Sequence, residues 1–115
     1  MFNHAFGQSP LVQLYAENAH VSSDNPWFNT VAKHPFNVGF DFNHESSYTQ
    51  TFVKDMLTYW LQEYKVDGFR FDLSKGFTQK NSGISEDDLS DWSAYDASRV
   101  AILMKYQQHI RSIDP

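Results

Sequence analysis

Residues 66–75 read VDGFRFDLSK, and this stretch governs what we expect of the fold. Polar or small residues alternate here with apolar ones: Gly68, Arg70 and Asp72 against Phe69, Phe71 and Leu73. Successive side chains of a β-strand point to opposite faces. The pattern therefore predicts a strand over residues 66–73 with one apolar face and with an arginine and an aspartate on the other. Such a polar face suits a strand whose end lines the mouth of a barrel.

A helix is expected on the N-terminal side of this strand, over residues 47–64. Its apolar residues recur at the spacing of one helical face: Phe52, Val53, Met56, Leu57, Trp60, Leu61 and Tyr64. Ser46 or Ser47 is a suitable N-cap, because a serine oxygen accepts a hydrogen bond from the first turn of a helix.

A second helix is expected over residues 94–112, with Ser93 or Asp91 as its N-cap. Its apolar stripe comprises Ala97, Val100, Ala101, Met104 and Ile110. Residues 1–46 and 76–92 are rich in turn-forming residues and are expected to be irregular, apart from a short helical turn at residues 11–16. The order loop, helix, strand, loop, helix predicts the α/β class.

Composition excludes several classes of function. The chain has 115 residues, a net charge of −5 and no basic stripe, which argues against nucleic acid and anionic membranes as partners. No apolar run is long enough to span a membrane. Cysteine is absent, which excludes disulfides and thiolate metal sites and leaves the compartment open, a secreted or periplasmic parent included. The five histidines lack the short spacings typical of zinc sites.

Arg70 and Asp72 are the candidate catalytic pair. A strand places both on one face, and a cation beside a carboxylate favours the ionised form that a nucleophile needs. The same spacing also suits an ion pair that only closes the end of a strand. On spacing alone both interpretations stay open.

Residues 67–75, DGFRFDLSK, resemble the second signature region of the α-amylase family of glycoside hydrolases (the family 13 type). In that family this region ends the fourth strand of a catalytic barrel. The resemblance implies that Asp72 is the nucleophile, that Arg70 orients it and that Lys75 binds sugar. The family commonly has a histidine after this lysine, where the present chain has Gly76.

Two shorter matches extend the resemblance. Asn3 and His4 are similar to the close of the family's first signature, which implies calcium coordination by Asn3 and a sugar contact by His4. The stretch 41–43 resembles a short region in which the aspartate, here Asp41, binds calcium. Asn3, Asp41 and the Gly76 carbonyl form the implied calcium set, since calcium takes several oxygen ligands. Asp41 also suits a simple Asx turn. Residues 25–29, 34–37 and 41–46 resemble the same family.

The resemblance implies an internal fragment of a (β/α)8 TIM barrel. Residues 1–46 would be a loop region between the third strand and third helix, and residues 47–115 would form a partial barrel segment. A whole barrel needs about 250 residues. A piece with one strand and two helices exposes apolar surface, so we expect an incomplete or rearranged fold that self-associates.

The implied parent is a retaining α-glucan hydrolase acting on starch or maltooligosaccharides. A retaining glycosidase needs a second carboxyl group about 5 Å from its nucleophile. The glutamates of this chain fall in predicted loops or on a predicted helix, so we expect the chain alone to be inactive. Two alternatives remain: a transglycosylase or branching enzyme of the same family, and a non-catalytic carbohydrate-binding or scaffolding relative.

Overall fold

A computed structural model describes residues 3–36 and 38–115, so that Met1, Phe2 and Asn37 lie outside the described residues. Within these ranges the secondary structure is mostly helical. The strands are β1 (His4–Ala5), β2 (Ala16–Glu17), β3 (His20–Val21) and β4 (Phe40–Asp41). The helices are α1 (Pro10–Gln13), α2 (Ser47–Glu63), α3 (Leu89–Ser93) and α4 (Ala97–Ile113), with 3-10 turns η1 (Ser74–Gly76) and η2 (Glu86–Asp88).

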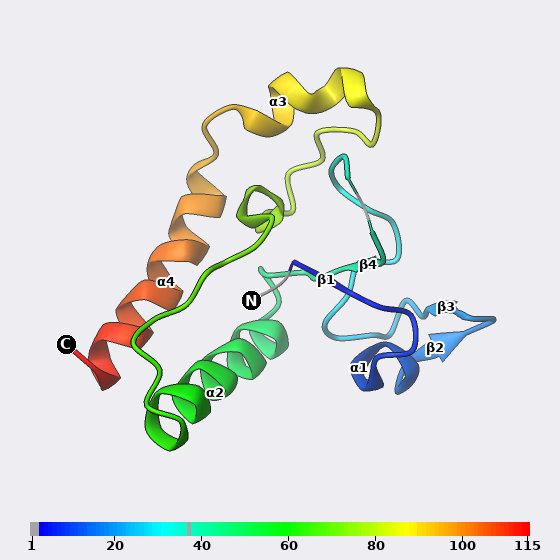
Figure 1. The fold of residues 1–115 in the computed structure, drawn as a ribbon. Coiled ribbons are helices and arrows are strands. Elements are labelled where there is room, and N and C mark those ends of the chain that lie inside the picture. The colour runs from blue at the N-terminus through cyan, green and yellow to red at the C-terminus, as the bar shows by residue number, and fades with distance from the viewer. Residues whose placement is uncertain (1–2, 37) are drawn as a thin grey trace.

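The strands pair in two small antiparallel sheets, β1 with β4 and β2 with β3. Figure 1 shows α2 and α4 on one side of the molecule and α1, β2 and β3 on the other, with the β1–β4 pair between them. None of the described helices is long and apolar enough to cross a membrane.

The α/β assignment and the expectation of a (β/α)8 TIM-barrel fragment are wrong. The described residues form two small antiparallel sheets and four helices, without parallel pairing. The stretch 66–73 is not a strand, because none of the strands among the described residues pairs with it to complete its backbone hydrogen bonds. Phe69 and Phe71 pack instead against the core beside α2 and α4. Leu73, at φ 47°, then turns the chain into η1.

The helix expected over residues 47–64 is confirmed as α2. Val53, Leu57 and Leu61 are its buried apolar residues, spaced one helical turn apart. Ser46 occupies the N-cap position, but its hydroxyl donates to the Pro26 carbonyl (2.6 Å) and makes no capping bond. The serine therefore ties the start of α2 to the preceding segment.

The helix expected over residues 94–112 is confirmed as α4, which begins later, at Ala97, and is preceded by the separate short helix α3. Ala94 is extended, and Asp96 caps α4 by accepting hydrogen bonds from the Ser98 and Arg99 amides. The predicted caps, Ser93 and Asp91, were therefore wrong. The predicted apolar stripe was wrong in part: Ile110 packs against the core as expected, but α4 buries Ile102 and Tyr106 while Val100 and Met104 are exposed.

Two apolar clusters hold the elements together. The larger lies between α2 and α4 and comprises Val53, Leu57, Phe77, Ile102 and Tyr106. The smaller lies within residues 12–28 and comprises Val12, Val21 and Phe28. Each buried side chain of this size stabilises the fold by about 1.5–3 kcal/mol relative to exposure. Phe77 is central, because it follows η1 directly and packs against Tyr106 of α4.

Candidate functional site

The β1–β4 pair brings two candidate site residues to one face. His4 of β1 lies opposite Asp41 of β4 in the antiparallel register. Residues directly opposite each other in such a pair point to the same side. Two further backbone hydrogen bonds fix the pair: Phe42 donates to the Asn3 carbonyl (3.0 Å), and Asn29 donates to the Asp41 carbonyl (2.8 Å).

A buried polar cluster forms beside this pair from Asn3, His34 and Asp41, whose exposed fractions are 1%, 0% and 2%. Asn3 Nδ2 lies 3.0 Å from both Asp41 Oδ1 and His34 Nε2. His34 Nε2 lies 3.1 Å from Asp41 Oδ1. We call these three residues the Asn3–His34–Asp41 cluster. Three polar side chains this deeply buried and in mutual contact form a site with a defined geometry.

Gly76 of η1 lies directly against the cluster. A Cβ atom added at Gly76 would collide with Asn3 Nδ2 and His34 Nε2. The structure therefore brings together Asn3, Asp41 and Gly76, the residues implied for calcium. It also brings in His34, which sequence reasoning did not select.

His34 is held in one orientation. Its Nδ1 donates a hydrogen bond to the Pro35 carbonyl (2.7 Å), which fixes the proton on that nitrogen because a carbonyl only accepts. Its ring stacks on Trp92 of α3, with centroids 5.2 Å apart and planes 3° from parallel. Burial lowers the pKa of His34, but the hydrogen bond to Asp41, the Pro35 carbonyl and the Asp41 charge outweigh burial and raise that pKa.

Two further groups complete the surroundings of the cluster. Asp41 Oδ2 accepts a hydrogen bond from Asn29 Nδ2 (2.8 Å). His4 lies against His34 with ring centroids 5.3 Å apart. His4, His34 and Asp41 each offer one ligand atom within 4.8 Å of the other two, as a metal-binding group would.

The residues named for calcium do not make an all-oxygen site. Calcium takes about six to eight oxygen ligands. Here the His34 imidazole nitrogen lies at hydrogen-bond distance from both Asn3 and Asp41, so any ion between these side chains meets a nitrogen. The donor set fits calcium poorly, and calcium at this position stays a prediction.

Arg70 and Asp72 form an exposed ion pair. Arg70 Nη2 lies 3.7 Å from Asp72 Oδ1, and the two side chains are 90% and 45% exposed. Because nearly half of the Asp72 side chain is exposed, solvent and small molecules can reach its carboxylate. The pairing that the sequence predicted is therefore present, on a different backbone conformation.

Lys75 has partners of its own on α3. Its Nζ donates to Ser93 Oγ (2.9 Å) and lies 5.6 Å from the centre of the Trp92 ring. These contacts join Lys75 to the helix that carries Trp92 and not to Asp72.

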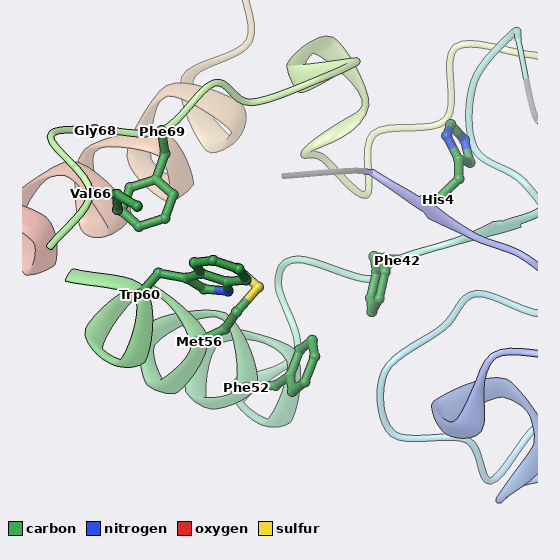
Figure 2. Close-up of a pocket in the computed structure, with 8 residues that line it drawn as sticks. All are labelled: His4, Phe42, Phe52, Met56, Trp60, Val66, Gly68 and Phe69. Atoms are coloured by element: carbon green, nitrogen blue, oxygen red, sulfur yellow. The ribbon is translucent and has the colours of Figure 1, made fainter. Parts of the chain in front are cut away.

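An open apolar cavity of about 460 Å³ lies next to His4. Figure 2 shows Phe52, Met56 and Trp60 along α2, with Val66 and Phe69 across from them and Phe42 and His4 toward one end. We call this cavity the aromatic groove; its lining residues are His4, Phe42, Phe52, Met56, Trp60, Val66, Gly68 and Phe69. His4 belongs both to this groove and to the surroundings of the buried cluster.

Sequence reasoning missed His34 and the groove for different reasons. His4, His34 and Asp41 are far apart along the chain, so no short motif marks them. His34 was missed because it is brought to β1 by the tertiary fold, in which β4 pairs with β1 and Asp41 contacts His34. The groove residues of α2 were read as one core-facing stripe, although Phe52 and Trp60 are 37% and 42% exposed.

Comparison with known proteins gives one short similarity to a carbohydrate-active enzyme. A stretch of 36 residues, 31% of this chain, is 53% identical to part of a pullulanase from Bacillus subtilis (strain 168). The match covers 5% of the pullulanase, so the chain spans a small part of that relative's length. No protein-family model matches the chain.

Proposed function

We propose that this chain contributes the nucleophile of a retaining α-glucan hydrolase, with Asp72 as that nucleophile. The observation that carries the proposal is the Arg70–Asp72 ion pair within the stretch 67–75. The short similarity to a pullulanase supports the same class of enzyme. A carboxylate that solvent can reach is able to attack an anomeric carbon, and the guanidinium beside it holds its orientation.

Such an enzyme also needs a second carboxyl group, and the contacts described for Asp72 do not include one. Retaining glycosidases place an acid/base carboxyl about 5–5.5 Å from the nucleophile. Among the described residues, no hydrogen bond or ion pair joins a glutamate to Asp72. We therefore expect this chain alone to release no reducing sugar from starch above the level of an Asp72→Ala variant.

The substrate that suits this proposal is a maltooligosaccharide or a longer α-glucan. The aromatic groove offers apolar ring faces, against which the C–H faces of a sugar pack. His4 adds a hydrogen-bonding group at the groove. Lys75, which the resemblance implies as a sugar ligand, contacts Trp92 and does not line the groove. A transglycosylase or branching enzyme would use the same nucleophile and differ in the acceptor.

The nucleophile can be tested without the missing acid catalyst. An activated fluoroglucoside carries fluoride as a leaving group that needs no protonation. Asp72 would form an ester to C1 as the C1–F bond breaks and fluoride departs, and mass spectrometry would detect the sugar on the peptide that contains residue 72. We expect labelling of the unmodified chain and of Asp67→Asn, a matched change at an exposed aspartate. We expect no labelling of Asp72→Asn.

The aromatic groove favours a second candidate function, a non-catalytic carbohydrate-binding module. Its lining is largely aromatic and open to solvent. In that case maltooligosaccharides bind the chain, and Trp60→Ala weakens binding, while the fluoroglucoside leaves Asp72 unmodified. These two results together would reject Asp72 as the nucleophile and support carbohydrate binding by the aromatic groove.

A further inference from the structure

We propose that His4, His34 and Asp41 bind a divalent transition-metal ion of the zinc type at the Asn3–His34–Asp41 cluster. The inference goes beyond the proposed function, because the cluster and the Arg70–Asp72 pair share no residue. Imidazole nitrogen combined with carboxylate oxygen is a ligand set that zinc and its neighbours prefer, whereas calcium and magnesium prefer oxygen alone.

The spacing of the ligand atoms fits one small ion. At metal–ligand distances of about 2.0–2.2 Å, two ligand atoms on one zinc ion lie roughly 3–3.5 Å apart. His34 Nε2 and Asp41 Oδ1 are already 3.1 Å apart. The His4 ligand atom lies within 4.8 Å of both. A movement of the His4 side chain by roughly 1–1.5 Å would complete three ligands at zinc distances.

Each ligand on the buried side already has an orienting partner. The Pro35 carbonyl accepts from His34 Nδ1, which leaves Nε2 as the nitrogen directed toward Asp41. Asn29 donates to Asp41 Oδ2 and leaves Oδ1 toward His34. Such second contacts, a carbonyl on the far nitrogen of a histidine and a donor on the far oxygen of a carboxylate, typically orient metal ligands.

Asn3 supplies an independent observation. Its Oδ1 atom has no hydrogen-bond partner among the described residues. Asn3 is only 1% exposed, so this atom is buried as well as unpartnered. A buried polar atom without a partner is costly and needs an explanation. A rotation of the amide places Oδ1 where Nδ2 now lies, 3.0 Å from His34 Nε2 and Asp41 Oδ1. There it faces two other potential ligands, an arrangement that a cation between them stabilises.

His4 also lines the aromatic groove. An imidazole has two distinct nitrogens, one of which can bind an ion while the other donates a hydrogen bond. His4 would thus join the ion to the aromatic groove that it lines. The alternative is a cluster held by a His34–Asp41 ion pair alone, without any ion.

Zinc binding is tested on the full 115-residue chain after removal of metal by a chelator. We expect isothermal titration with Zn²⁺ to give one ion per chain, and Co²⁺ to produce a visible absorption band that Zn²⁺ removes. Ca²⁺ should not compete. The Asn29→Ala variant, which removes only the donor to Asp41, should raise the Zn²⁺ Kd about 10–100-fold. His34→Gln should raise it further, while the exposed His20→Gln control leaves it unchanged.

A measurement without mutation guards against variants that fail to fold. NMR of the imidazole nitrogens should show the His34 and His4 signals shifting when Zn²⁺ is added, with His20 unaffected. Unchanged His34 signals at saturating Zn²⁺ would overturn the proposal, as would competition by Ca²⁺ or loss of Zn²⁺ binding only in His20→Gln. Labelling of Asp72 by the fluoroglucoside does not involve this site, so either proposal can fail while the other stands.

Discussion

The His44 imidazole stacks on Phe77 with ring centroids 3.8 Å apart, and this contact links the segment before α2 to the segment after η1. His44 Nδ1 is also joined to the Tyr106 hydroxyl of α4 by a hydrogen bond of 2.9 Å. The histidine is fully buried, and its Nε2 has no partner among the described residues. Burial lowers the pKa of His44 to about 3, with the Asp41 charge opposing and His4 reinforcing that shift. His44 is therefore a neutral part of the core.

Acid should destabilise the chain through His44. In the unfolded chain His44 binds a proton below a pH of about 6.5, whereas in the folded chain it stays neutral down to about pH 3. The contribution of His44 is thus fully present above pH 6.5 and is lost as the pH falls. We expect the free energy of unfolding to fall by up to about 1.4 kcal/mol per pH unit in this window. Denaturant titrations at a series of pH values measure the slope.

The control for this prediction is the comparison of His44→Gln with His20→Gln. The first variant should lose the His44 part of the slope, and the second should keep it because His20 is exposed. His34 acts in the other direction, since its pKa is raised: its contribution is present at low pH and is lost as the pH rises through the folded value. An equal slope in the unmodified chain and in a folded His44→Gln variant would contradict the prediction.

Gly76→Ala should destabilise the fold, whereas Gly68→Ala should not. The added methyl group at residue 76 would enter the Asn3–His34–Asp41 cluster, while a Cβ at residue 68 meets nothing within 4 Å. Overpacking of a filled site typically costs about 1–3 kcal/mol. Thermal unfolding of the two variants, followed by circular dichroism, compares the same chemical change at a filled and at an open position. Equal melting temperatures would show that Gly76 does not lie against the cluster.

Local patterns predicted the helices better than they predicted the strand. The spacing of Val53, Leu57 and Leu61 forms a helical face whatever surrounds it, so α2 could be predicted within a residue of its ends. Residues 66–73 alternate as a strand does, but a strand exists only beside another strand. Because that partner is lacking, Phe69 and Phe71 pack on the core as parts of an irregular segment. The conformation of residues 66–73, on which the fold prediction rested, is therefore determined by tertiary contacts and not by the local pattern.

The candidate site was predicted in part, for a similar reason. The resemblance selected Asn3, Asp41 and Gly76, and these residues do meet. His34 entered through the fold of the segment between Asn29 and Asp41, which no local pattern in the sequence indicates. On α4, both the stripe with Val100 and Met104 and the one with Ile102 and Tyr106 are apolar. Contact with α2 selects the second.

Asp96→Ala should destabilise the C-terminal half of the chain. The Asp96 carboxylate caps α4 through the Ser98 and Arg99 amides, and it accepts hydrogen bonds from the Thr78 and Ser98 hydroxyls. Loss of an N-cap costs about 0.5–2 kcal/mol, and the buried Thr78 hydroxyl would also lose its acceptor. Denaturant unfolding at neutral pH measures the loss. Asp87→Ala, at an exposed position of η2, is the matched control and should change stability little.

Protonation of the Asp96 carboxylate should cause a second loss of stability at low pH. Burial raises the pKa of Asp96, but hydrogen bonds from Ser98, Thr78 and the Arg99 and Ser98 amides outweigh burial and lower that pKa to about 2. Its contribution is present above the unfolded value of 3.8 and is lost as the pH falls toward 2. The free energy of unfolding, plotted against pH, should therefore fall more steeply below pH 4 in the unmodified chain than in Asp96→Ala. Identical curves for the two proteins would contradict the role of Asp96.

The aromatic groove should make the chain associate with itself. Phe52 and Trp60 of α2 remain 37% and 42% exposed, and together with Phe69 they form an open apolar surface. Contiguous apolar surface of this kind promotes association in water. Light scattering across a series of protein concentrations should show a molar mass that rises above that of one chain. Trp60→Lys should reduce the rise because it places a charge in the groove, whereas Tyr95→Lys, at a side chain 79% exposed outside the groove, should not. A constant monomer mass at every concentration would show that the groove stays open in solution, and the groove would then be accessible to a carbohydrate without prior dissociation of chains.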